Sequence, residues 1–95
     1  MTKEQIIHYL SEHKETFKEK YSVEKIGLFG SFARGEAGAT SDIDLYVEMK
    51  PSLFDMVGLK QEIESDLHRD VDLIREHKNI KPLLREMIVK DLTYV

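Results

Sequence analysis

Three short runs rich in apolar residues have the composition expected of β-strands. The runs are Val23–Phe29, Asp42–Glu48 and Val71–Ile74. Because side chains alternate across a strand, Asp42 and Asp44 of the second run should project from one face, while Ile43, Leu45 and Val47 point to the other. The pattern therefore predicts a strand with one buried face and one face that carries two like charges.

The segments around these runs repeat their apolar residues at helical spacing. One helix is predicted over about Lys3–Lys20, because Thr2 and Gln5 form a capping-box pattern at its start. Further helices are predicted after Ser52, whose hydroxyl can cap a helix, and from Pro82 at a first-turn position. The residues expected to face the core are Ile6, Leu10, Phe17 and Tyr21 in the first helix, Leu53, Met56, Leu59, Ile63 and Leu67 in the second, and Leu83 or Leu84, Met87, Ile88 and Leu92 in the last.

A short helix over Ser31–Arg34 after the first strand completes the order αβαβαβα. This order predicts an α/β fold with a small sheet flanked by helices. Ninety-five residues are enough for one domain with a single core, so residues 1–95 are predicted to form a single domain.

Composition narrows the classes of function. The chain has 18 acidic and 14 basic side chains and a net charge of −4, so it has no broad basic surface and nucleic acid is a weak candidate for its substrate. It has no cysteine, no apolar stretch long enough to cross a bilayer and no secretory signal at its N-terminus. We therefore expect a soluble, cytoplasmic protein without a membrane partner.

The stretch from Gly30 to Asp44 has the residues that nucleotidyl transfer needs. Glycine leaves a phosphate free access to the backbone, and the Ser31 hydroxyl with the N–H groups of the following helix can bind a triphosphate. Ten residues later, Asp42 and Asp44 hold two carboxylates together, which is costly unless a cation such as Mg²⁺ lies between them. Asp-x-Asp alone is weak, but the whole Gly-Ser-x10-Asp-x-Asp pattern is expected by chance in about one chain per thousand.

A third carboxylate from a neighbouring strand would complete a site for two Mg²⁺ ions. Asp72 is our choice, because a charge in the middle of an apolar strand indicates that its face opens onto a polar site; Asp70 is the alternative. Arg34 could offset phosphate charge during transfer, although a surface ion pair would explain it equally well. The four histidines have no partners at metal-ligand spacing and are assigned no role.

The run GSFARGEAGATSDIDLYVEM, followed by SLFDMVGLKQEIE and VDLI, resembles the minimal nucleotidyltransferase domains of the DNA polymerase β superfamily. The resemblance covers nearly the whole chain. It implies a mixed sheet of three or more strands flanked by helices, with ATP and Mg²⁺ as ligands. The matching functional positions are Gly30, Ser31, Asp42, Asp44 and Asp72.

Family members of this size are commonly antitoxins of a HEPN ribonuclease, and some of them transfer AMP to a tyrosine of that toxin. The resemblance therefore implies a protein adenylyltransferase that pairs with a HEPN toxin, in a hetero-oligomer with it. Two alternatives remain. The chain could mask its partner stoichiometrically, or it could transfer a nucleotide to a small molecule, although the superfamily members that do so carry an additional helical domain. A P-loop and a dinucleotide-binding unit are excluded because their glycine motifs are absent.

Overall fold

Four strands form one mixed sheet. In the computed structural model, which describes residues 1–95, these strands are β1 (Val23–Phe29), β2 (Ile43–Met49), β3 (Val71–Arg75) and β4 (Thr93–Tyr94). Their order across the sheet is β3-β2-β1-β4. β1 runs antiparallel to β2 and to β4, whereas β2 and β3 run parallel. The α/β fold with a mixed sheet, expected from the sequence, is confirmed.

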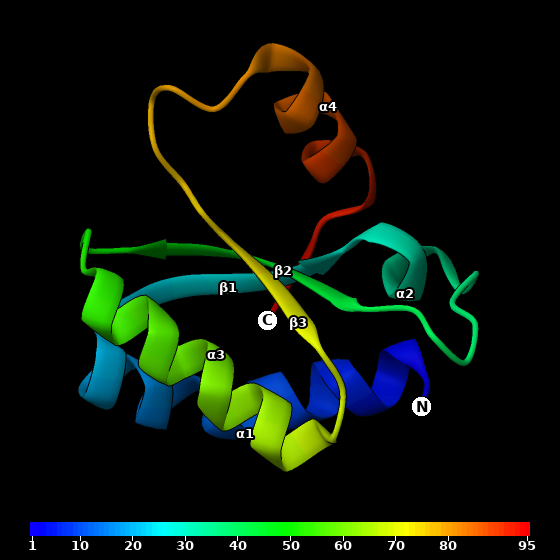
Figure 1. Cartoon of the computed structure of the whole chain (residues 1–95), viewed down its shortest axis with the longest axis horizontal. Coiled ribbons are helices and arrows are strands. Elements are labelled where there is room, and N and C mark those ends of the chain that lie inside the picture. The colour runs from blue at the N-terminus through cyan, green and yellow to red at the C-terminus, as the bar shows by residue number, and fades with distance from the viewer.

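Four helices pack around this sheet. They are α1 (Lys3–Tyr21), α2 (Gly30–Arg34), α3 (Leu53–Leu67) and α4 (Pro82–Asp91). Figure 1 shows α1 and α3 together on one side of the sheet and α4 alone on the other. The short α2 follows β1 directly and contacts α4, so it lies at the end of the sheet where the acidic residues of β2 begin. No helix of the chain is both long and apolar enough to cross a membrane.

Two apolar clusters hold these layers together. The larger one lies between the sheet and the layer of α1 and α3, and its most buried members include Ile6, Leu10, Phe17, Ile26, Leu28, Ile43, Leu45, Val47, Leu59 and Ile63. A small cluster on the α4 side contains Phe29, Tyr46, Ile80 and Ile88. Ile88 is the only buried residue of α4, so that helix covers its face of the sheet thinly. The face that carries the acids thus stays accessible.

The predicted helix starts are confirmed by their caps. At the start of α1, the backbone N–H of Thr2 donates to Gln5 Oε1 at 2.8 Å and the N–H of Gln5 donates to Thr2 Oγ1 at 3.2 Å. At the start of α3, the N–H of Asp55 donates to the Ser52 hydroxyl at 3.1 Å. Each cap satisfies N–H groups that have no partner within the helix.

Three expectations about the apolar residues were wrong. Leu83 or Leu84 was expected to face the sheet, but the two are 70% and 37% exposed. Leu53, the first residue of α3, was expected to face the core but is 81% exposed. Met87 is 59% exposed because α4 packs on the sheet mainly through Ile88. In addition, the order αβαβαβα lacks the last strand. β4 has only two residues, and pairing with Gly27 and Leu28 of β1 defines it.

Candidate active site

Two acidic side chains are neighbours across the central strands, on the α4 side of the sheet. Asp44 of β2 pairs with Phe29 of β1 on one side and with Asp72 of β3 on the other. All three residues line a pocket of about 450 Å³. Ile43 and Leu45, on either side of Asp44, are fully buried against α1 and α3. The alternation of the strand therefore holds Asp44 on the opposite, accessible face.

The turn after β1 brings the backbone against Asp44. Gly30 has φ +76°, in the left-handed region, and a Cβ at this position would collide with the carboxyl group of Asp44, lying 2.9 Å from its Cγ. Glycine is thus needed for the backbone conformation and for the space that the carboxyl group occupies. Ser31, the next residue, also lines the pocket.

Negative charge is concentrated around Asp44 in this pocket. The pKa of Asp44 is raised above its usual range, first by burial and then by the charges of Asp72 and Asp42, while Arg34 opposes these effects. None of the three aspartates makes a side-chain hydrogen bond or ion pair. Like charges placed together in this way favour a cation between them.

Asp42 and Asp70 lie outside this pocket. Asp42 precedes β2, is exposed, and borders a separate depression together with Asp70. Its charge nevertheless contributes to the raised pKa of Asp44. The backbone carbonyl of Asp70 accepts a hydrogen bond from the N–H of Ile43 at 2.9 Å. Because Asp72 lines the pocket beside Asp44 and Asp70 does not, the geometry favours Asp72 as the third acid.

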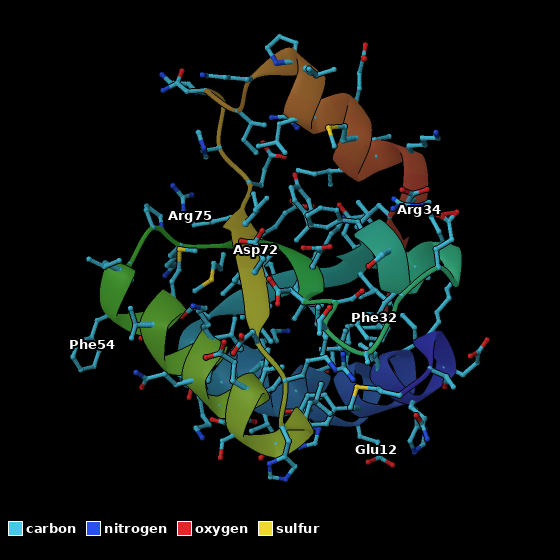
Figure 2. The ribbon with its side chains drawn as sticks, turned by 45° about the vertical axis from the view of Figure 1, so that its right-hand side comes forward. Glu12, Phe32, Arg34, Phe54, Asp72 and Arg75 are labelled. Atoms are coloured by element: carbon cyan, nitrogen blue, oxygen red, sulfur yellow. The ribbon has the colours of Figure 1, made fainter.

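Arg34 forms ion pairs with two carboxylates at the edge of the pocket. Its Nη1 donates to Asp91 Oδ2 at 2.8 Å, and its Nε lies 3.3 Å from Glu36 Oε2. In Figure 2, Asp72 and Arg34 both lie on the α4 side of the sheet, with Arg34 beside the C-terminal end of α4. The hydrogen bonds to Asp91 and Glu36 raise the pKa of Arg34. In this state of the molecule Arg34 therefore connects α2 to α4, as the ion-pair alternative expected.

Sequence reasoning missed the contribution of α4 to the pocket. Four of its residues line the wall opposite the sheet: Leu84, Met87, Lys90 and Asp91. Lys90 forms no ion pair, so its positive charge is available to an anionic ligand. Nothing in the local sequence distinguishes it from a solvated lysine at a helix C-terminus.

The donor set fits a hard divalent cation. Carboxylate oxygens are the protein ligands that Mg²⁺ prefers, and it commonly completes its shell with water and substrate phosphates. No three histidine, aspartate or glutamate side chains converge into a ready-made metal cage. The raised pKa of Asp44 beside Asp72 in an open pocket agrees with such an ion, with Asp44 and Asp72 as adjacent ligands. Asp42 lies outside the pocket, but its charge acts on Asp44.

Comparisons with known proteins identify the family of the chain. The family described as nucleotidyltransferase domain matches residues 10–95. The chain is 34% identical to protein adenylyltransferase MntA of Thermococcus cleftensis, over 100% of this chain and 97% of that protein. It is 40% identical to MJ1379 of Methanocaldococcus jannaschii, provisionally named a protein adenylyltransferase, over 99% of this chain and 98% of that protein.

Solved structures show the same fold. One that is provisionally described as a minimal nucleotidyltransferase is 30% identical, with a TM-score of 0.78 over 98% of this chain and 95% of that chain. A structure of a tri-AMPylated Shewanella oneidensis HEPN toxin in complex with MNT antitoxin is 21% identical, with a TM-score of 0.68 over 98% of this chain and 71% of that chain. By its sequence and its fold, the chain belongs to the nucleotidyltransferase family and is an enzyme of the group of minimal nucleotidyltransferases that includes the protein adenylyltransferases.

Proposed function

We propose that this protein transfers AMP from ATP, with Mg²⁺, to a hydroxyl group of a HEPN toxin, and that it acts as the antitoxin of that toxin. A tyrosine is the expected acceptor. In this proposal residues 1–95 act as one minimal nucleotidyltransferase domain, working in the cytoplasm, where ATP is available. The relative named protein adenylyltransferase MntA and the structure of a tri-AMPylated HEPN toxin with an MNT antitoxin support the choice of a HEPN toxin as the acceptor protein.

One observation carries the proposal. Asp44 and Asp72 are neighbours across β2 and β3 in a pocket that Gly30 also lines, and neither carboxylate forms a hydrogen bond or ion pair within the chain. Two neighbouring carboxylates without a hydrogen bond or ion pair repel each other in the free protein, and a ligand that brings positive charge would relieve this repulsion. A triphosphate that arrives with a metal ion is such a ligand.

Each of several pocket residues has its own proposed role in binding ATP. Gly30 gives the turn its left-handed conformation, and the hydroxyl of Ser31 beside it can donate to phosphate oxygens. Lys90 supplies a free positive charge from the opposite wall. Arg34 lines the pocket together with Asp91, to which it donates a hydrogen bond. If this bond breaks, the guanidinium group of Arg34 can bind a phosphate instead. A solved toxin-antitoxin structure with AMP-PNP, 24% identical and with a TM-score of 0.69 over 87% of this chain and 69% of that chain, agrees with a nucleotide ligand in this fold.

The acids provide for the chemical step. Asp42, Asp44 and Asp72 would hold Mg²⁺, which neutralises phosphate charge and lowers the pKa of the attacking hydroxyl when it is bound. The acceptor oxygen would lose its proton to solvent and form a bond to the α-phosphorus, while the bond to pyrophosphate breaks and pyrophosphate leaves with the electron pair. Asp72 lines the pocket and is exposed, so the acceptor is expected to approach there.

Transfer of labelled phosphate to the purified partner tests this proposal. ATP labelled on the α-phosphate should label the HEPN protein encoded beside this chain, whereas ATP labelled on the γ-phosphate should not. Asp72→Asn should slow labelling by about a hundredfold or more, because a carboxylate that faces the developing charge is lost. Asp70→Asn is the matched control, since it removes a neighbouring acid that lies outside the pocket.

Three results would count against the proposal. Labelling from the γ-phosphate would indicate phosphoryl transfer instead of nucleotidyl transfer. Equal loss in the two variants would indicate that charge in general, and not Asp72, supports the reaction. Labelling that persists in a chelating buffer would exclude the role of Mg²⁺.

A further inference from the structure

Asp42 lies at the end of a segment, between α2 and β2, that forms no helix or strand. Residues 36–42 belong to no helix or strand. Within it, the N–H of Ser41 donates to the Gly38 carbonyl at 3.2 Å, and the N–H of Gly38 donates to the Ser41 hydroxyl at 2.9 Å. These two bonds close a turn over residues 38–41, immediately before Asp42, whose side chain has no hydrogen-bond or ion-pair partner. The position of Asp42 therefore depends on what holds the turn.

Arg69 holds this turn from outside. Its Nη1 lies within hydrogen-bond distance of three backbone carbonyls of the turn, those of Ser41 at 3.0 Å, Ala39 at 3.2 Å and Gly38 at 3.4 Å. A guanidinium group can serve several acceptors at once because its donors are rigidly arranged in one plane. The charge of Arg69 is thus directed to backbone carbonyls, and it forms no ion pair with any carboxylate of the chain.

Arg69 is itself held in place by the core and the sheet. Its guanidinium carbon lies 5.2 Å from the centroid of the Phe32 ring, over its face, and Phe32 is a buried residue of α2. Arg69 also lies two residues before β3, where the carbonyl of Asp70 binds the N–H of Ile43 at the start of β2. One side chain thereby connects α2, the turn and the edge of β3, three segments that meet around Asp42.

We propose that Arg69 is a positioning residue that fixes the turn over residues 38–41 and so holds Asp42 in reach of the metal ion at Asp44. This inference rests on the proposed metal site. Arg69 does not touch the reacting groups, and it acts through the backbone of the turn. Groups that orient metal ligands typically change metal affinity by 10–100-fold when they are removed, so a loss of about tenfold is expected for an indirect contact.

The test combines hydrogen exchange with Mn²⁺ binding on the whole chain. In Arg69→Ala, without metal, the amide of Ser41 should exchange about tenfold faster, because the turn loses its external hydrogen bonds. In the same variant the affinity for Mn²⁺, measured by electron paramagnetic resonance, should fall about tenfold. Arg75→Ala is the matched control: Arg75 is also a half-buried arginine of the β3 region, but it donates to the carbonyl of Glu76, far from the turn.

A double-variant comparison separates positioning from general destabilisation. If Arg69 acts through Asp42, Arg69→Ala should weaken Mn²⁺ binding in the natural chain but have little further effect in a chain that carries Asp42→Asn. An equal effect in both backgrounds would overturn the proposal, as would Ser41 exchange no faster than in Arg75→Ala. A natural chain that binds no Mn²⁺ would contradict the proposed metal site and, with it, this inference. Binding that is normal in both the natural chain and Arg69→Ala would overturn the role of Arg69 alone.

Discussion

At Gly30 the backbone and the acidic site need the same space. Gly30→Ala should therefore do two kinds of damage. A left-handed alanine costs roughly 1–2 kcal/mol of folding free energy, and its Cβ would push the carboxyl group of Asp44 away from its present position. We expect lower stability in urea and a loss of about tenfold or more in affinity for Mn²⁺.

Gly35 provides a control for this substitution. It has φ +72° at the end of α2, but a Cβ there would meet nothing within 4 Å. Gly35→Ala should cost a similar amount of stability and leave Mn²⁺ affinity nearly unchanged. If the two variants lost the same metal affinity, the contact between Gly30 and Asp44 would not support the site.

We expect the ionised carboxylate of Asp44 to lower the stability of the fold while it serves the proposed metal site. Its pKa is raised in the folded chain, so its ionised form is less favourable there than in the unfolded chain. The stability that this group contributes is present below the unfolded pKa and is lost as pH rises through the folded pKa. At neutral pH, Asp44→Asn should raise the melting temperature by about 2–4 °C, since roughly half a kcal/mol is reasonable for a repulsion partly screened by solvent.

The pH profile distinguishes this explanation from a simple gain in packing. The advantage of Asp44→Asn over the natural chain should shrink as pH is lowered through the pKa of Asp44, because the natural side chain becomes neutral as well. Scanning calorimetry over this range is the measurement. An advantage that does not change with pH would contradict the electrostatic cause, and a variant less stable than the natural chain at neutral pH would do so directly.

At the scale of elements, β4 depends on a glycine of β1. A Cβ on Gly27 would lie 2.7 Å from Cδ1 of Leu92 and 3.0 Å from the carbonyl oxygen of Thr93. Gly27→Ala should therefore push β4 away from β1, at a cost of about 1–3 kcal/mol in the free energy of unfolding, and should increase hydrogen exchange at the N–H of Val95, which binds the Ile26 carbonyl.

Gly38 is a suitable comparison for this change. It has no close neighbour, since the nearest atom to an added Cβ is the Ser41 hydroxyl at 4.0 Å. Gly38→Ala should leave both stability and Val95 exchange close to those of the natural chain. A Gly27→Ala protein as stable as the Gly38→Ala protein would show that β4 contributes nothing measurable to the sheet.

Elements with strong local patterns were predictable from the sequence. The capping box at Thr2 and the alternation along β2 are encoded by neighbouring residues, and both appear in the structure as expected. β4 was missed because two residues carry no periodicity, and their pairing with β1 is a tertiary contact. The exposure of Leu53 was missed because helical periodicity identifies a face, and the position where the underlying sheet ends is not visible in it.

Only the part of the candidate site that lies on the sheet was predictable from the sequence. Asp44 and Asp72 could be paired from two strands of known periodicity, and the structure has them as cross-strand neighbours. The α4 half could not be predicted, because the ion pair between Arg34 and Asp91 joins residues 57 positions apart. Lys90 lines the same pocket as Gly30 and Ser31 because the fold brings α4 over this face of the sheet. No local sequence pattern indicates this proximity.

At the scale of the whole molecule, the site lies on the thinly covered side of the sheet. α1 and α3 occupy the other face, and α4 alone bounds the pocket. In the proposed function this pocket holds the nucleotide, and Asp72, an exposed lining residue, faces the acceptor. The acceptor hydroxyl is therefore expected to come from a second macromolecule, and the net charge of −4 disfavours a polyanion such as RNA.

The intact mass of the HEPN partner after co-expression tests the central claim most directly. With the natural chain, the partner should gain the mass of one AMP unit or a small multiple, and cell growth should be restored. With a chain that carries both Asp42→Asn and Asp44→Asn, the mass should stay unchanged and the toxin should remain active. If the partner instead stays unmodified with the natural chain and is still silenced by the double variant, the protein masks its partner by binding, and the claim of AMP transfer is contradicted.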